Sequence, residues 1–186
     1  GEAASVGNLG TKVNALTFNS DGVLLAAGSP SDPQGSNLYT LDAVSGRATA
    51  FGTLPSQYRS AGDLAFDSSG LLYFTTTNGR LVRINLDARI WEDVGSTSFG
   101  DFFGLSMDWA DRLHGYRNAE ELYRLARDSG ALEFLGTFAD LPVQGIYGAS
   151  SLVLPQGPAA GSIPIVFRQG LWLLDTAGNF GSAELV

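Results

Sequence analysis

Short stretches in which apolar and polar residues alternate run along most of the chain, and turns containing Gly or Asp separate them. Residues 16–25 have the sequence LTFNSDGVLL, and residues 64–73 have the sequence LAFDSSGLLY. Each stretch combines an alternating strand, a glycine-containing turn and a second strand, which predicts a β-hairpin. A weaker copy occupies residues 105–114, and a fourth begins at residues 151–154.

Each hairpin is followed by a third apolar stretch of one repeating form. These stretches align without gaps at residues 38–42, 81–85, 122–126 and 171–175. A short fourth stretch then ends in an apolar residue, a glycine and a polar residue. This ending occurs five times for four hairpins, at residues 6–8, 51–53, 94–96, 135–137 and 180–182.

Four short antiparallel strands repeated about every 45 residues are typical of β-propeller blades. We therefore predict an all-β fold, a β-propeller of four-stranded antiparallel blades that forms one domain over residues 1–186. The four blades are expected at approximately residues 12–55, 56–98, 99–142 and 143–186. Residues 1–11 are expected to supply an extra strand, which either closes the last blade or belongs to a preceding one. A β-sandwich is the main alternative, but it gives no reason for one order of strands to recur.

The composition is consistent with a β-propeller and excludes several classes of function. Hydrophobic residues make up 44% of the chain and charged residues 16%, and the 24 glycines suit short strands joined by tight turns. The net charge of -8 and the single lysine, Lys12, leave little to neutralise phosphates, so we expect no nucleic-acid partner. The absence of cysteine excludes disulfides and thiolate chemistry. No apolar run is long enough to predict a membrane span, and the acidic surface favours an extracellular or periplasmic location.

The repeated motifs resemble those of a known group of bacterial proteins. A strand ending in Phe-Asp/Asn-x-x-Gly is followed by Leu-Tyr, by a Leu-Tyr-x-Leu-Asp strand and by a Phe/Val-Gly-Thr ending. This pattern resembles the NHL, YVTN and SMP-30-like β-propeller repeats over nearly the whole chain. The resemblance implies the blade fold but no single activity, since the group includes protein-binding surface modules and metal-dependent lactonases.

The lactonase-like members imply a divalent cation held by a Glu, Asn and Asp set at the central channel. The candidate positions in this chain are Asn14, Asp63, Asp101 and Asp108, but no glutamate occurs at a corresponding place. A hard cation needs several converging oxygens. We therefore predict no metal site, no cofactor and no catalytic residue. The only histidine, His114, is expected to be half-buried and structural.

Aromatic residues and arginines concentrate in the loops before the first strands and between the second and third strands, which share one face of a propeller. Such residues combine a large contact area with oriented hydrogen bonds. We predict a recognition surface for a protein or a glycan, formed by Tyr58, Arg59, Phe102, Tyr116, Arg117, Tyr147 and Arg168. The alternative is that loops gather such residues without a binding role. We expect that replacing four of them together, Tyr58, Arg59, Tyr116 and Arg117, leaves the fold intact.

Three functions remain open at this point. The leading one is a noncatalytic binding or interaction module. The second is a structural or assembly protein whose subunits self-associate by pairing terminal β-strands, since unpaired strand edges are templates for strand addition. The third is a metal-dependent hydrolase of the lactonase-like kind.

Overall fold

The structure is a computed structural model. It describes residues 4–29, 31, 35–118, 120–138 and 149, and the backbone alone of residues 163–167, 170–174 and 180–183. These residues form antiparallel β-sheets and no helix, which confirms the all-β prediction for the described part of the chain. Among them, no helix has the length and apolar content needed to cross a membrane.

Three sheets have four strands each, and neighbouring strands in every sheet are also consecutive in the chain. Blade 1 consists of β1 (Val13–Phe18), β2 (Leu24–Gly28), β3 (Asn37–Leu41) and β4 (Ala48–Thr53). Blade 2 consists of β5 (Ser60–Phe66), β6 (Leu72–Thr76), β7 (Arg80–Asn85) and β8 (Ile90–Ser96). Blade 3 consists of β9 (Phe102–Met107), β10 (Leu113–Arg117), β11 (Glu121–Leu125) and β12 (Leu132–Thr137).

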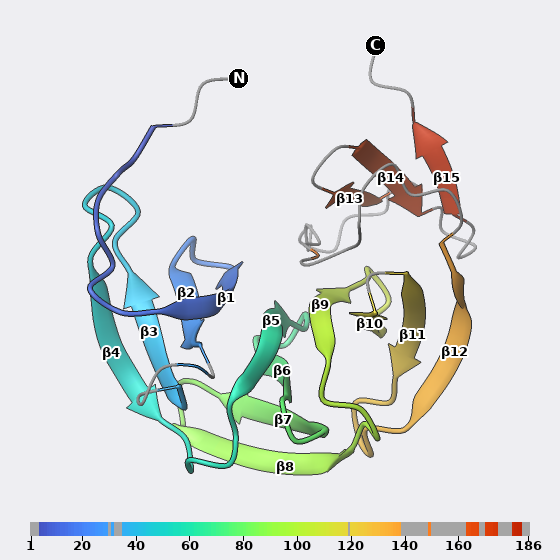
Figure 1. Cartoon of the computed structure of the whole chain (residues 1–186), viewed down its shortest axis with the longest axis horizontal. Coiled ribbons are helices and arrows are strands. Elements are labelled where there is room, and N and C mark those ends of the chain that lie inside the picture. Colours follow the sequence, from blue (N-terminus) through green and yellow to red (C-terminus); the bar gives the residue numbers. More distant parts are fainter. Residues whose placement is uncertain are drawn as a thin grey trace.

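A fourth sheet contains β13 (Ile163–Phe167), β14 (Gly170–Leu174) and β15 (Phe180–Ala183). It has three strands in the described part of the chain rather than the predicted four, because the first strand predicted at residues 151–154 lies outside that part. The four sheets follow one another along an arc, and the fourth stands across an opening from blade 1 (Figure 1). The described strands therefore form an open arc, and no described strand closes the last blade as one of the two alternatives for residues 1–11 expected.

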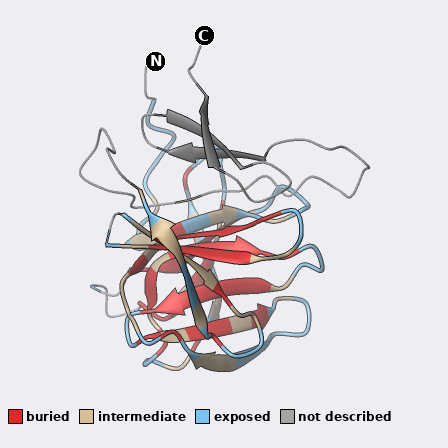
Figure 2. Cartoon of the chain, turned by 90° about the vertical axis from the view of Figure 1, so that its right-hand side faces the viewer, coloured by how far each residue is buried: buried red, intermediate tan, exposed pale blue. Residues whose placement is uncertain are grey.

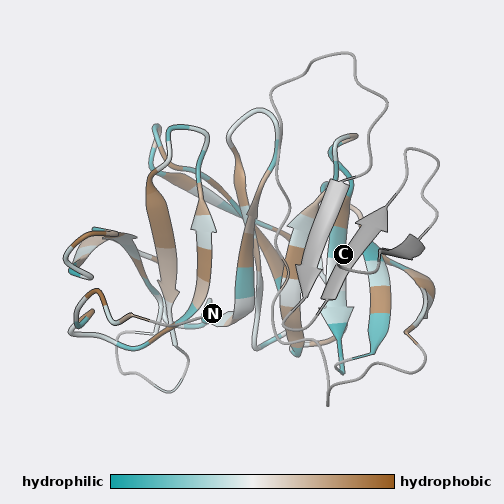
Figure 3. Ribbon diagram, turned by 90° about the horizontal axis from the view of Figure 1, so that it is seen from above, coloured by the Kyte–Doolittle hydropathy of each residue, from teal (hydrophilic) through white to brown (hydrophobic). Residues whose placement is uncertain are grey.

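The blades pack against one another through their inner strands. Strand β1 contacts β5, and β5 contacts β9, whereas β4, β8 and β12 lie on the outside of the arc (Figure 1). Buried residues follow the strands and exposed residues gather at the turns (Figure 2), and hydrophobic bands mark the strands (Figure 3). The core is therefore made where one sheet faces the next.

Period-two alternation gives each blade two apolar faces. On one face of blade 2, cross-strand neighbours form two rows, Leu64, Phe74 and Val82, and Phe66, Leu72 and Ile84. These side chains share a single core cluster with Ala15, Leu25, Ala27 and Leu38 of blade 1, and the cluster continues into blade 3. The apolar face of each sheet is thus buried only when a neighbouring sheet packs against it.

The hairpin turns are held by one side chain at a repeated position. In blade 2, Asp67 Oδ1 accepts hydrogen bonds from the backbone N–H groups of Ser69 at 3.0 Å and Leu71 at 2.9 Å. Asn19 and Asp108 accept the same pair of bonds in blades 1 and 3. Capping of the turn explains why Asn or Asp recurs there.

Two glycines of the repeated fourth-strand ending, Gly7 and Gly95, lie directly against the turn of the next unit. A Cβ on Gly95 of blade 2 would lie 1.8 Å from the Ser129 carbonyl oxygen of blade 3. Gly7 has the same relation to blade 1, with 1.9 Å to the Ser45 carbonyl oxygen. Residues 4–10 nevertheless form no strand, so the extra strand expected in residues 1–11 is absent from the described part of that range. This segment docks on a turn without pairing into a sheet.

We predict that Gly95→Ala lowers the free energy of unfolding by about 3 kcal/mol, because backbone atoms of blade 3 cannot yield to the added methyl group. Gly52→Ala is the matched control, since Gly52 has the same place in blade 1 and its Cβ would meet nothing within 4 Å. Urea unfolding of both variants tests this. Equal stability of the two variants would contradict it.

Candidate interaction surface

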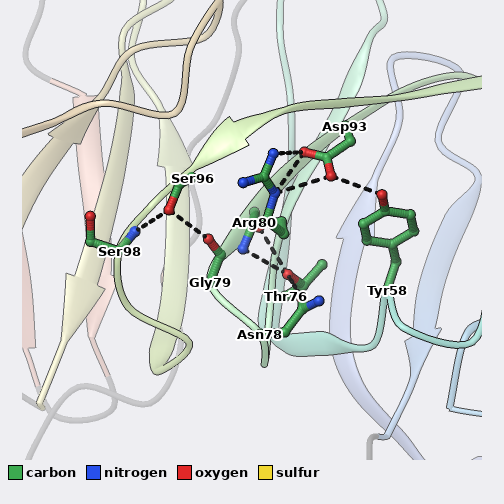
Figure 4. Close-up of polar contacts among 8 residues, drawn as sticks. All are labelled: Tyr58, Thr76, Asn78, Gly79, Arg80, Asp93, Ser96 and Ser98. Atoms are coloured by element: carbon green, nitrogen blue, oxygen red, sulfur yellow. Dashed lines mark hydrogen bonds and ion pairs between the residues drawn. The ribbon is translucent and has the colours of Figure 1, made fainter.

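Tyr58, one of the predicted recognition residues of blade 2, belongs to a polar network with Asp93 and Arg80 (Figure 4). Tyr58 is buried, and its hydroxyl donates to Asp93 at 2.8 Å, a bond that raises the pKa of Tyr58. Arg80 Nε donates to both oxygens of the same carboxylate, at 2.9 and 3.0 Å. Arg59 is half-buried, and its Nε donates to the Ser56 carbonyl at 3.2 Å. These groups tie the loop before β5 to strands β7 and β8.

The predicted recognition residues of blade 3 are either buried or bound to other side chains of the protein. Phe102 and Tyr116 are buried, and burial raises the pKa of the Tyr116 hydroxyl to about 12. The Arg117 guanidinium donates to Asp101 and to Glu121, both at 2.7 Å. It also lies over the ring of Phe99, with Cζ 3.9 Å from the ring centroid. The two carboxylates neutralise this arginine at the rim.

Tyr58, Phe102 and Tyr116 therefore do not offer exposed side chains to a partner. We expected that Tyr58, Arg59, Tyr116 and Arg117 could be replaced together without loss of the fold. That expectation is corrected, because replacing Tyr58 and Tyr116 would remove two buried side chains and the hydrogen bond from Tyr58 to Asp93. Arg59 and Arg117 retain partial exposure, and a binding role for them stays a prediction. Tyr147 and Arg168 lie outside the described residues.

Asp63 joins three parts of the arc near its inner strands. Its Oδ1 accepts the N–H of Leu64 at 2.9 Å, and its Oδ2 accepts the N–H groups of Leu105 of blade 3 and Ala149, both at 3.0 Å. Burial raises the pKa of Asp63 to about 7, although the three amide donors oppose that rise. The carboxylate is thus a structural tie between backbone segments far apart in the chain.

The candidate lactonase-like positions are not brought into one site by the contacts of the described residues. Asp101 is paired with Arg117, Asp108 with Arg112 at 2.6 Å, and Asn14 Nδ2 donates to the Ser60 carbonyl at 2.9 Å. The described part of the chain contains no group of three or more His, Asp or Glu side chains that could hold a metal ion. His114 is buried rather than half-buried, and burial lowers its pKa.

On the inner strand of blade 1, two large apolar side chains are exposed although their counterparts in the other blades are buried. Leu16 and Phe18 are 50% and 59% exposed, whereas their counterparts in the repeat are 2% and 9% exposed in blade 2 (Leu64 and Phe66). In blade 3 the counterparts Leu105 and Met107 are each 1% exposed. In blades 2 and 3 a preceding blade covers these positions, and no described sheet precedes blade 1.

We call this surface the open face of blade 1. Cross-strand pairing defines it as two rows, Leu16, Ala26, Tyr39 and Ala50, and Phe18, Leu24, Leu41 and Ala48. Ala26, Tyr39 and Leu41 are buried in a cluster with Leu9 and Val13, so the exposed large side chains of the two rows are Leu16 and Phe18. No charged residue occurs in either row. The sequence predicted that these residues are apolar positions of strands. It could not predict that Leu16 and Phe18 are exposed, because exposure depends on whether another sheet packs on them.

The comparisons with known proteins support the fold. No protein-family model matches the chain, and no curated protein matches it by sequence. Solved structures do match. A structural-genomics protein of unknown function from Bacteroides thetaiotaomicron has a TM-score of 0.64 at 20% identity, over 93% of this chain and 48% of that chain. An auxiliary nutrient binding protein from Bacteroides ovatus has a TM-score of 0.59 at 12% identity, over 91% and 46%.

A third match is YCF48 bound to D1 peptide, with a TM-score of 0.57 at 14% identity, over 94% of this chain and 51% of that chain. These likenesses, together with the radial four-stranded sheets, identify the fold as propeller-like. The chain spans about half the length of each of these structures.

We predict that the raised pKa of Asp63 makes the protein less stable as pH increases. The folded state holds the proton up to about pH 7, whereas the unfolded chain releases it near 3.8, so the free energy of unfolding falls between these values. Each unit of pKa difference corresponds to about 1.4 kcal/mol, which makes the expected loss a few kcal/mol. Urea unfolding at pH 4 to 8 measures it.

Asp63→Asn should remove this decline. Buried His114, whose pKa is lowered, contributes the opposite slope, and the difference between wild type and the variant cancels that contribution. The exposed Asp42→Asn serves as the control that keeps the decline. The same pH dependence in wild type and Asp63→Asn would contradict the assignment.

Proposed function

We propose that this chain is a noncatalytic protein-interaction module and that the open face of blade 1 is its interaction surface. The observation that carries the proposal is the contrast in exposure between Leu16 and Phe18 and their buried counterparts in blades 2 and 3. Contiguous exposed apolar surface marks interaction sites in soluble proteins. The face consists of aliphatic and aromatic side chains, which favours a protein over the glycan that the loops alone left open.

Other parts of the proposal rest on broader grounds. Membership of the NHL, YVTN and SMP-30-like repeat group is supported by the blade motifs, and an extracellular or periplasmic location by the acidic composition. Two proteins of similar fold are a nutrient binding protein and a protein bound to a peptide, so the fold is compatible with binding. A lactonase-like hydrolase has less support, because Asp63 is occupied by three backbone amides.

The test is capture of partner proteins from an extract of the source organism by wild type, Phe18→Ser and Ile90→Ser. Ile90 is 63% exposed and is the matched control, because it is an apolar residue in the outer strand β8 of blade 2, outside the open face. We expect proteins that wild type and Ile90→Ser retain and that Phe18→Ser loses. Capture that does not depend on Phe18 would contradict the proposed surface.

A further inference from the structure

The outer strands of blades 1, 2 and 3 differ in charge. Strands β8 and β12 carry a glutamate at matching positions of the repeat, Glu92 and Glu133, and each forms an ion pair with an arginine of the neighbouring strand, Arg83 or Arg124. The two glutamate side chains are 56% and 59% exposed. Thr49 of β4 occupies the same position in blade 1, and β4 contains no charged residue. Among these three blades, blade 1 alone lacks a charge on its outer strand.

A charged residue on an edge strand opposes the pairing of that edge with another strand. In all three blades the outer strand ends its sheet, and no strand in the described part of the chain lies beyond it. These strands also lie on the outside of the arc, where another molecule can reach them (Figure 1). The edges of β8 and β12 are thus protected by Glu92 and Glu133, whereas the edge of β4 is open to strand addition.

The pairing of β4 with β3 determines which backbone groups lie at this edge. The Asp42 N–H donates to the Arg47 carbonyl at 3.0 Å, and hydrogen-bonded and non-hydrogen-bonded pairs alternate from there along the two strands. Thr49 is therefore at a hydrogen-bonded position, and Ala48 and Ala50 are at non-hydrogen-bonded positions on either side of it. The N–H and C=O groups of both alanines point away from β3, toward the open edge.

We propose that the edge of β4 pairs with the same strand of a second copy of the chain, antiparallel, about a two-fold axis at Thr49. Ala48 of each copy then stands opposite Ala50 of the other, and each of these pairs exchanges both of its N–H···O bonds. The two Thr49 side chains face each other, which is a favourable cross-strand pair, whereas the same pairing of β8 or β12 would bring two glutamates together. The uncharged edge of β4 is therefore complementary to itself. The open face takes no part in this contact, so the inference is independent of the proposed function.

The experiment is sedimentation equilibrium of the purified chain over a wide range of concentration. We expect wild type to form a dimer that dissociates on dilution. Thr49→Glu should weaken dimerisation roughly tenfold or more, because it places two carboxylates opposite each other on the axis. Ser20→Glu is the matched control, since it adds the same charge at an exposed position in the β1–β2 turn of the same blade, and it should dimerise as wild type does.

A second variant separates loss of pairing from loss of fold. Thr40→Arg combined with Thr49→Glu gives blade 1 the cross-strand ion pair that blades 2 and 3 have, and Thr40 is half-buried as Arg83 and Arg124 are. The sheet should therefore be retained and dimerisation should still be lost, with circular dichroism checking the sheet content. Phe18→Ser should dimerise as wild type does, because Phe18 is not on β4.

A monomer at every concentration, or a dimer that Thr49→Glu does not weaken, would overturn the inference. Equal weakening by Ser20→Glu would also overturn it, since net charge and not the edge would then be responsible. A dimer that only Phe18→Ser disrupts would mean that the copies meet at the open face, which overturns the edge contact and leaves the proposed function standing. A monomer that captures another protein through Thr49 overturns the second copy as the partner.

Discussion

The sheets of this protein carry apolar side chains on two faces, and the need to cover both faces determines how the chain is built. Burial of apolar surface contributes about 25 cal/mol per Å². A sheet with rows such as Leu64, Phe74 and Val82 on one side and Tyr73 and Leu81 on the other cannot bury both within itself. Stacking sheet on sheet solves this for blade 2, which has a neighbour on each side, and leaves blade 1 with one face open.

Polar side chains then fix the stacked sheets in place. Asp63 connects backbone amides of Leu64, Leu105 and Ala149, and the Arg127 guanidinium of blade 3 reaches Asp67 of blade 2 at 2.7 Å. Tyr58, Asp93 and Arg80 make a similar tie within blade 2. Residue types that often recognise ligands are therefore also used for structure in this protein, as Tyr58 and Arg80 show.

The repeat allowed the strands and turns of blades 1 to 3 to be predicted from the sequence, because alternation and turn chemistry are local. Asn19, Asp67 and Asp108 illustrate this, since each caps the turn in which it stands. Burial was harder to predict, because it depends on neighbours. Leu16 and Leu64 have the same place in the repeat but differ in exposure, because blade 1 precedes Leu64 and no sheet in the described part of the chain precedes Leu16. The contact of Gly7 with Ser45 could not be predicted from the sequence either, since the identity of a glycine does not show which turn packs against it.

The open face of blade 1 also bears on how the structure opens. When each sheet contacts only its neighbours, stability is close to a sum of intrinsic terms and nearest-neighbour terms. Among the described sheets, blade 2 has two neighbours and blade 1 has one, so the local free energy of opening is lower at blade 1. Amide hydrogens of β1 and β2 should then exchange with solvent sooner than those of β5 and β6, and binding at Leu16 and Phe18 would slow them. A partner bound to the open face could therefore be detected as slower hydrogen exchange of the backbone amides of β1 and β2.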